Sequence, residues 1–136
     1  VERAEDHGIP RADVIVDPLV MPIGAMNDAG RQVFSLLRRL KGELKVNSTC
    51  GASNISFGLP HRHVLNGHFL AMASLAGMTS AIMNPLHKEE LDGVRAANML
   101  NGTDPDCAAW LAANRPVEPA EGGRARRTNR RRRTSA

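Results

Sequence analysis

The chain has 136 residues, 42% of them hydrophobic, which is enough for one domain with a core of its own. Its net charge of +4 arises at one end, because residues 115–136 contain eight arginines and two glutamates, and the basic total therefore says nothing about the folded part. No apolar run reaches transmembrane length and no basic-then-apolar leader is recognisable, so we expect neither a membrane partner nor secretion. Cys50 and Cys107 are isolated and lack metal-ligand spacing, and a reduced, cytoplasmic setting is the simplest account of them.

The first predicted elements are the end of a helix over residues 1–7 and a strand over residues 14–16. The chain starts inside a charged, helix-like run, so we expect a fragment or a processed chain. The β-branched run at 14–16 suits a strand buried on both faces. Asp17 follows it, and Pro18 cannot continue a central ladder. The Asp17 carboxylate is therefore either a loop cap or a site residue.

A helix and a second strand come next. The helix is predicted to open at Asn27 or Asp28 and to end at Gly42. The second strand is predicted over residues 44–50. Its centre is polar, so tertiary contacts must outweigh the low β-strand propensity of these residues. The helix has one apolar face, formed at i, i+3, i+4 and i+7 by Val33, Leu36, Leu37 and Leu40.

A loop bracketed by glycines follows the second strand, at residues 51–58. Gly51 and Gly58 permit backbone angles and close ligand approach that a Cβ would prevent. Asn54 and Ser56 are neutral groups that can donate and accept hydrogen bonds. Taken alone, the loop fits an ordinary strand-to-helix turn as well as a ligand site.

The next helix is predicted to begin at Asn66, with Leu65 and Leu70 as a hydrophobic staple. Gly77 is its expected end. The expected buried stripe of this helix consists of Phe69, Met72, Ala73 and Ala76.

The remaining pattern predicts a third strand over residues 79–84, a helix over residues 88–100 and a short helix opening at 104–105. Residues 1–113 form the expected folded domain. We expect residues 114–136 to be a disordered, arginine-rich tail, because no apolar period continues there.

The alternation of strands and helices predicts an α/β fold with a parallel sheet. Polar side chains cluster where each strand ends: at Asp17, at residues 51–56 and at Asn84. In α/β barrels this face carries the chemistry.

Four stretches carry a resemblance to a known family. They are Val16-Asp17-Pro18-Leu19, Gly51-Ala52-Ser53-Asn54-Ile55-Ser56, the pair Arg62 and Asn66, and Phe69-Leu70-Ala71-Met72-Ala73. In this combination they resemble the pterin-binding methyltransferases that act on methyltetrahydrofolate and a corrinoid (cobalamin) cofactor. The family fold is a (β/α)8 TIM barrel of about 250 residues, related to dihydropteroate synthase. The three β/α units and the short helix resemble the sixth to eighth units, so the resemblance implies the C-terminal part of such a barrel.

The resemblance also implies roles for individual residues. Asn54 is the expected catalytic residue, because it corresponds to the contact with N5 of the pterin and can accept a hydrogen bond from protonated N5. Asp17 can accept from N–H groups on the amide–amidine edge of the ring. The expected substrate-binding set is Asp17, Gly51, Ser53, Asn54, Ser56 and Arg62, with no metal ligand. Phe57 departs from the family, whose members carry Gln there.

The implied activity is transfer of the N5 methyl of methyltetrahydrofolate to or from cobalamin, which is carried by a corrinoid protein or free. The implied setting is one-carbon or methylamine and betaine metabolism, and a homodimer is one expected assembly. We expect this chain to be inactive alone, because an Asp and an Asn that contact the pterin on earlier strands of the family barrel are absent.

Two other functions compete with this interpretation. A dihydropteroate synthase-like enzyme needs a cation for its pyrophosphate leaving group, and Ser53-Asn54-Ile55 offers none. Nucleic-acid binding through Arg124 to Arg133 lacks interleaved aromatic side chains for stacking, which makes a nucleic-acid partner the weaker expectation.

A metal site is the third alternative. His61, His63 and His68 are close in sequence and Cys50 is near them. Zinc sites favour tighter pairs of ligands, so loop histidines beside a turn are the expected interpretation.

Overall fold

Three extended segments run parallel in the fold, and a helix follows each of them along the chain. The structure is a computed structural model that describes residues 1–116. Strand β1 (Ile15–Val16) pairs with β2 (Asn47–Ser48), with Ile15 opposite Asn47. The third segment meets the second at a parallel bridge between Gly51 and Ile82. The predicted parallel order is confirmed, but the third strand, predicted over residues 79–84, is reduced to this bridge.

The described residues contain five α-helices: α1 (Glu2–Asp6), α2 (Ala29–Arg39), α3 (Arg62–Ala76), α4 (Lys88–Leu100) and α5 (Ala108–Asn114). Shorter helical turns are η1 (Arg11–Asp13), η2 (Leu40–Leu44), η3 (Ala52–Ser56) and η4 (Pro105–Cys107). None of the helices in residues 1–116 combines the length and apolar character needed to cross a membrane. The predicted arginine-rich tail lies, from residue 117 onward, outside the described residues.

The polar composition of β2 is explained by hydroxyl groups that reinforce the sheet. The backbone N–H of Ser48 donates to Thr79 Oγ1 at 2.9 Å, and Thr79 Oγ1 donates to the Ser48 carbonyl at 3.0 Å. Ser80 Oγ also donates to the Ser48 carbonyl, at 3.0 Å. Because Ser48 is 1% exposed, these bonds satisfy groups that burial would otherwise leave unpaired.

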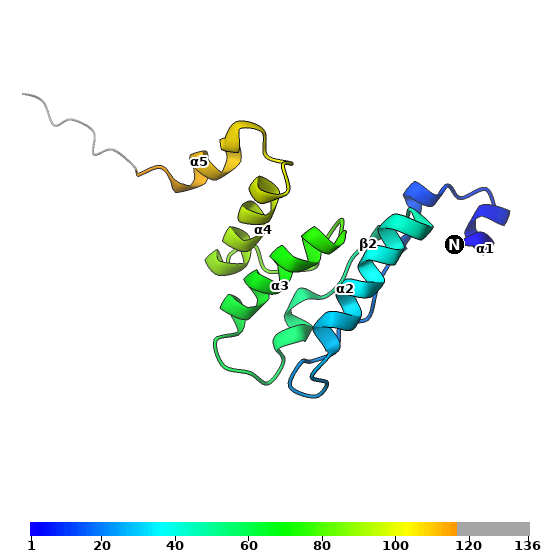
Figure 1. The fold of residues 1–136 in the computed structure, drawn as a ribbon, viewed down its shortest axis with the longest axis horizontal. Helices are drawn as coiled ribbons and strands as arrows, with labels where there is room; N and C mark the ends of the chain where they lie inside the picture. Colours follow the sequence, from blue (N-terminus) through cyan, green and yellow to red (C-terminus); the bar gives the residue numbers. More distant parts are fainter. Residues whose placement is uncertain (117–136) are drawn as a thin grey trace, which may run out of the picture.

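Helices α2, α3 and α4 lie side by side and cover one face of the strands (Figure 1). Leu37 of α2 and Leu70 of α3 are 0% and 1% exposed and lie in the core between these helices and the sheet. Phe34 stacks on Phe69 with ring centroids 5.8 Å apart, which joins α2 to α3.

Two glycines allow α3 and α4 to approach closely. A Cβ on Gly67 would lie 2.3 Å from the carbonyl oxygen of Glu89, and a Cβ on Gly93 would lie 2.3 Å from that of Gly67. Any larger residue at either position would force the two helices apart. This close crossing positions the start of α4 beside the start of α3.

The opposite face of the strands is open. Ile15 is 60% exposed and Ile82 is 69% exposed, and the pairing register places both on this face. The expectation that residues 14–16 are buried on both faces is therefore wrong for Ile15. Among the described residues, no layer packs over that side.

Several helix predictions need correction. Asn66 does not cap α3, which begins at Arg62, so the staple of Leu65 and Leu70 does not form there. Gly42 does not end α2, because a π-helical turn carries the chain on to Lys45, whose φ is 53°. Met72 is 56% exposed, whereas Phe69, Ala73 and Ala76 are buried as predicted. The predicted bounds of α4 and the stop at Gly77, whose φ is 115°, are confirmed.

Candidate functional site

The loop after β2 turns through η3 and presents Asn54 at the ends of the strands. Asn54 is exposed, and its backbone N–H donates to the Gly51 carbonyl at 3.1 Å. A Cβ on Gly51 would lie 3.3 Å from Asn54 Nδ2, so glycine leaves room for the amide to fold back over the backbone. Gly58 closes the loop with φ of 80°, a left-handed conformation that favours glycine.

A shallow depression of about 490 Å³ opens at this place. Ser53 and Asn54 form one wall and Asn84 with its neighbours forms the other; the lining residues are Gly51, Ser53, Asn54, Ile82, Met83, Asn84 and Pro85. The Asn84 side chain is held by its own turn, because Oδ1 accepts from the Leu86 N–H at 3.0 Å. The volume falls in the range of small-molecule sites, and the polar groups in it are neutral amides, hydroxyls and backbone.

Asp17 lies at the end of the neighbouring strand and is exposed, but it does not line the depression. Its Oδ1 accepts from the Leu19 N–H at 2.8 Å, so the carboxylate caps its own loop. Burial, and to a lesser extent the Asp17 charge, raises the pKa of the Cys50 thiol to about 11. The Asp17 carboxylate is thus close enough to influence the end of the second strand electrostatically.

Arg62 and Ser56 hold the loop in place through hydrogen bonds on its buried side. Arg62 Nη2 donates to the Ser53 carbonyl at 2.8 Å, and Arg62 Nε donates to Ser56 Oγ at 3.1 Å. Ser56 is 0% exposed, and its hydroxyl donates to the Ser53 carbonyl at 3.2 Å. The guanidinium also lies 5.7 Å from the centre of the exposed Phe57 ring. Three of the six residues predicted for the site, Gly51, Ser53 and Asn54, therefore line the depression. Arg62 and Ser56 hold the loop in shape, and the remaining residue, Asp17, lies outside the depression.

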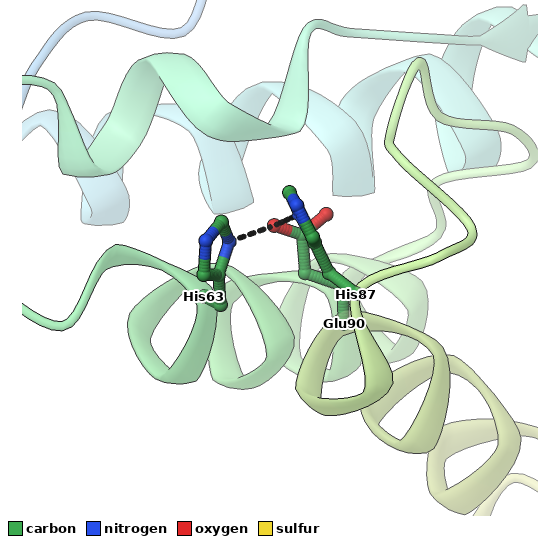
Figure 2. A group of neighbouring side chains, drawn as sticks. All are labelled: His63, His87 and Glu90. Carbon is green, nitrogen blue, oxygen red and sulfur yellow. Dashed lines mark hydrogen bonds and ion pairs between the residues drawn. The ribbon is translucent and has the colours of Figure 1, made fainter.

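A buried polar cluster, which the sequence analysis missed, stands directly behind this loop. Asn66 Nδ2 donates to Ser53 Oγ at 3.2 Å and to Glu90 Oε1 at 2.9 Å. Nδ1 of His63 and Nδ1 of His87 lie 3.2 and 3.3 Å from the same Glu90 oxygen (Figure 2). Asn66 and Glu90 are 1% and 0% exposed.

The hydrogen bonds decide the charge of Glu90. Burial on its own raises the pKa of this carboxyl, but the bonds from Asn66, His63 and His87 outweigh it and leave the pKa below the ordinary value of 4.5. Glu90 is therefore an ionised carboxylate inside the α3–α4 contact at neutral pH. The sequence contained a signal for this cluster. His63 and Asn66 are three residues apart, as are His87 and Glu90, and this spacing places the two members of each pair on the same face of a helix.

The histidines considered from the sequence as metal ligands separate in space. Only His63 belongs to the cluster; the ring of His68 bonds through Nδ1 to the Val64 carbonyl at 2.7 Å, and His61 is the exposed residue before α3. Cys50 Sγ instead contacts Met78 Sδ at 3.4 Å. Within the described residues 1–116, metal-ligating atoms come together at His63, His87 and Glu90.

Comparison with known proteins identifies the family of the chain. Residues 1–84 match the family described as pterin binding enzymes. The chain is 30% identical over 118 residues to the methylcorrinoid:tetrahydrofolate methyltransferase of Eubacterium limosum. The match covers 85% of this chain and 43% of that protein, so the chain spans less than half the length of its curated relative. The resemblance seen in the sequence is confirmed, and the chain belongs to the family of pterin-binding enzymes, whose fold is like a TIM barrel.

Proposed function

We propose that this chain forms the pterin-binding edge of a methyltransferase that moves the N5 methyl group between methyltetrahydrofolate and a corrinoid. The observation that carries the proposal is the depression at the ends of the parallel strands, with Asn54 folded over Gly51 at its wall. The relative from Eubacterium limosum acts, by its name, on a methylcorrinoid and tetrahydrofolate, and this supports the same pair of reactants here.

Asn54 is the proposed catalytic residue. Nitrogen N5 must carry positive charge when its methyl group leaves, because a neutral tertiary amine is a poor methyl donor. A side-chain carbonyl such as that of Asn54 accepts a hydrogen bond from protonated N5 and stabilises this charge. In the opposite direction N5 gains the same charge as it takes up the methyl group, so one contact serves both directions. The corrinoid cobalt, when present, accepts or donates the methyl group.

Asp17 is the proposed contact for the ring edge. Its Oδ1 is used by the Leu19 N–H, but the side chain is exposed and the carboxylate has further lone pairs for the N–H groups of a pterin. Ser53 and Gly51 line the depression and are proposed as nearby contacts. Arg62 and Ser56 act indirectly in this proposal, because their hydrogen bonds fix the loop that carries Asn54.

The wider setting follows the same resemblance. We propose that the corrinoid is presented by a partner protein and that the reaction serves one-carbon or methylamine and betaine metabolism in the cytoplasm. We also propose that the three strand–helix units correspond to the last three of a (β/α)8 barrel.

The 136 residues alone are expected to bind the pterin weakly and to transfer no methyl group. Within residues 1–116, the three parallel segments leave two unpaired edges and one uncovered face, where a closed barrel would supply further contacts. Mixing the purified chain with methyltetrahydrofolate and Co(I) cobalamin tests this. Turnover at a rate comparable with complete enzymes of the family would contradict the need for those further contacts.

The binding proposal is tested by a nuclear magnetic resonance titration, which suits a chain of 14.7 kDa. Methyltetrahydrofolate should shift the backbone amide signals of Gly51, Ser53, Asn54 and Asp17. p-Aminobenzoylglutamate, which has the tail of the folate but no pterin, is the control and should leave these signals in place. Shifts that are absent at millimolar ligand, or equal for the two compounds, would reject a pterin site here.

A further inference from the structure

His63, His87 and Glu90 converge on one point at the α3–α4 contact. His63 comes from the first turn of α3, and His87 and Glu90 come from the start of α4 (Figure 2). One ligand atom from each residue lies within 4.8 Å of the other two. The imidazole rings of the two histidines are 3.7 Å apart between centroids.

We propose that His63, His87 and Glu90 form a zinc site, with two imidazole nitrogens and one carboxylate oxygen as protein ligands and a fourth position open. Two histidines and a glutamate are a ligand set that zinc uses in proteins with three protein ligands and one exchangeable position. Imidazole ligands favour zinc and its transition-metal neighbours over magnesium or calcium, which prefer oxygen.

The two distances between the carboxylate oxygen and the imidazole nitrogens are those of a zinc site. Ligands at about 2.0–2.1 Å from a tetrahedral zinc ion are about 3.3 Å from one another. Glu90 Oε1 lies 3.2 Å from His63 Nδ1 and 3.3 Å from His87 Nδ1. An ion here takes the place of the two ring protons on Nδ1, which are released to solvent, and the two rings, whose centroids are now 3.7 Å apart, turn away from each other to direct their nitrogens at it.

The surroundings supply what a metal site needs beyond its ligands. Glu90 Oε2 is buried and has no hydrogen-bond partner among the residues that the structure describes, so the carboxylate has, beside Oε1, a second oxygen free to contact the ion. Asn66 Nδ2 holds Oε1 at 2.9 Å and orients the carboxylate. The side chains of His63 and His87 are 50% and 34% exposed, which gives the ion a path from solvent.

Hydrogen bonding alone is the competing account of the cluster. Three donors, from Asn66, His63 and His87, converge on Oε1, while the second oxygen of the same buried carboxylate receives none from the part of the chain that the structure describes. Donors that served only to satisfy the carboxylate would be better divided between its two oxygens. Two imidazole nitrogens gathered around one carboxylate oxygen also bring three ligand atoms within reach of a single ion.

The site touches both walls of the depression at the strand ends. Asn66 connects Glu90 to Ser53 on one wall, and His87 Nε2 lies 3.2 Å from Asn84 Nδ2 on the other. In the site, His87 Nδ1 is the ligand atom and Nε2 is the atom that faces Asn84, so the imidazole ring stands between the ion and that wall of the depression. The zinc ion thus has a positioning role: it holds the start of α4 and Asn84 against the loop of Ser53.

The test begins with the 136-residue chain freed of metal by a chelator. Co(II) is added as the visible probe, and Zn(II) is then used to displace it. One equivalent of Co(II) should give the absorption of a low-coordinate nitrogen and oxygen site, and one equivalent of Zn(II) should abolish it. His63→Ala and His87→Ala should each weaken binding by at least about tenfold. Failure of the wild-type chain to bind one equivalent would overturn the proposal.

Matched controls use the other histidines. The double variant His61→Ala, His68→Ala removes two imidazoles outside the cluster, one more than either test variant, and should leave the affinity unchanged. Zinc should also shift the ring-nitrogen resonances of His63 and His87 in the wild-type chain while those of His61 and His68 stay in place, a measurement that does not depend on whether any variant folds. Binding that survives in both His63→Ala and His87→Ala, or that is lost in the control, would reject this site.

Discussion

The side-chain amide of Asn66 on α3 donates a 2.9 Å hydrogen bond to the carboxylate of Glu90 on α4, and both side chains are almost completely buried. The same amide nitrogen lies 3.2 Å from Ser53 Oγ, so one side chain connects two helices and the loop that carries Asn54. The conformation of the loop at the strand ends and the stability of the α3–α4 packing therefore both depend on the Asn66 side chain.

Replacing Asn66 by alanine should destabilise the fold. It removes a hydrogen bond to a buried carboxylate, and losses of this kind cost about 1–3 kcal/mol. Asn98→Ala makes the same change at an exposed position of α4 and should stay within about 0.5 kcal/mol of wild type. Urea unfolding followed by circular dichroism measures both, and equal midpoints for the two variants would contradict the role of Asn66.

Glu90 should make the fold sensitive to acid. Its pKa is lowered in the folded chain, so it stabilises the fold above about pH 4.5, and that contribution is lost as the pH falls through the folded pKa. Glu90→Gln keeps the size of the side chain and removes the titration, so its free energy of unfolding should fall less steeply below pH 4.5. Glu89→Gln removes an exposed neighbouring carboxylate and should keep the wild-type slope. Parallel pH profiles for Glu90→Gln and wild type would contradict the prediction.

The close crossing of α3 and α4 predicts a contrast between two Gly→Ala substitutions. At Gly67 the new methyl group would lie 2.3 Å from a backbone carbonyl, and overpacking of this kind costs about 1–3 kcal/mol or more. At Gly42 the new methyl group meets nothing within 4 Å, and alanine should leave the stability unchanged or raise it by about 0.4–1 kcal/mol. Thermal unfolding of both variants decides the matter, and a Gly67→Ala protein as stable as wild type would show that the helices can separate without cost.

The two cysteines should differ in reactivity. Cys50 is 0% exposed and its thiol pKa is raised to about 11, so at pH 8 it is both inaccessible and protonated. Cys107 is partly exposed at the start of α5. A disulfide reagent should therefore titrate one thiol quickly in the folded chain and the second only after unfolding, with Cys107→Ser removing the fast phase. Two equally fast thiols would contradict the buried position of Cys50.

The sequence was informative where local signals determine structure. The acidic residues at 89 and 90 and the pair Asn101-Gly102 bound α4 correctly, and Gly77 was recognised as the end of α3. These signals act within one or two turns of the chain, as caps and stops do. The order of strands and the position of Asn54 at a strand end also follow from such signals.

Long-range partners were the source of the errors. Asparagine is a residue type favoured at the N-caps of helices. Asn66 instead lies inside α3, where its side chain bonds to Glu90, 24 residues further along the chain. Met72 and Ile15 lie at positions where the spacing of apolar residues predicts burial, yet both are exposed. The spacing does not show which apolar face a neighbouring element will cover. The His63, His87 and Glu90 group likewise exists only because Gly67 and Gly93 let two helices meet.

The affinity of methyltetrahydrofolate for the chain, compared between wild type, Asp17→Asn and Asn54→Ala, tests the central claim most directly. At neutral pH the ring-edge bonds to the Asp17 carboxylate are charge-assisted and worth about 1.5–3 kcal/mol, so Asp17→Asn should weaken binding about tenfold or more. Asn54→Ala should weaken it much less, because its proposed contact strengthens only when N5 becomes charged. Saturable binding with this order of effects is the predicted result. No saturable binding, or an Asp17→Asn chain that binds as well as wild type, would contradict a pterin site at these strand ends.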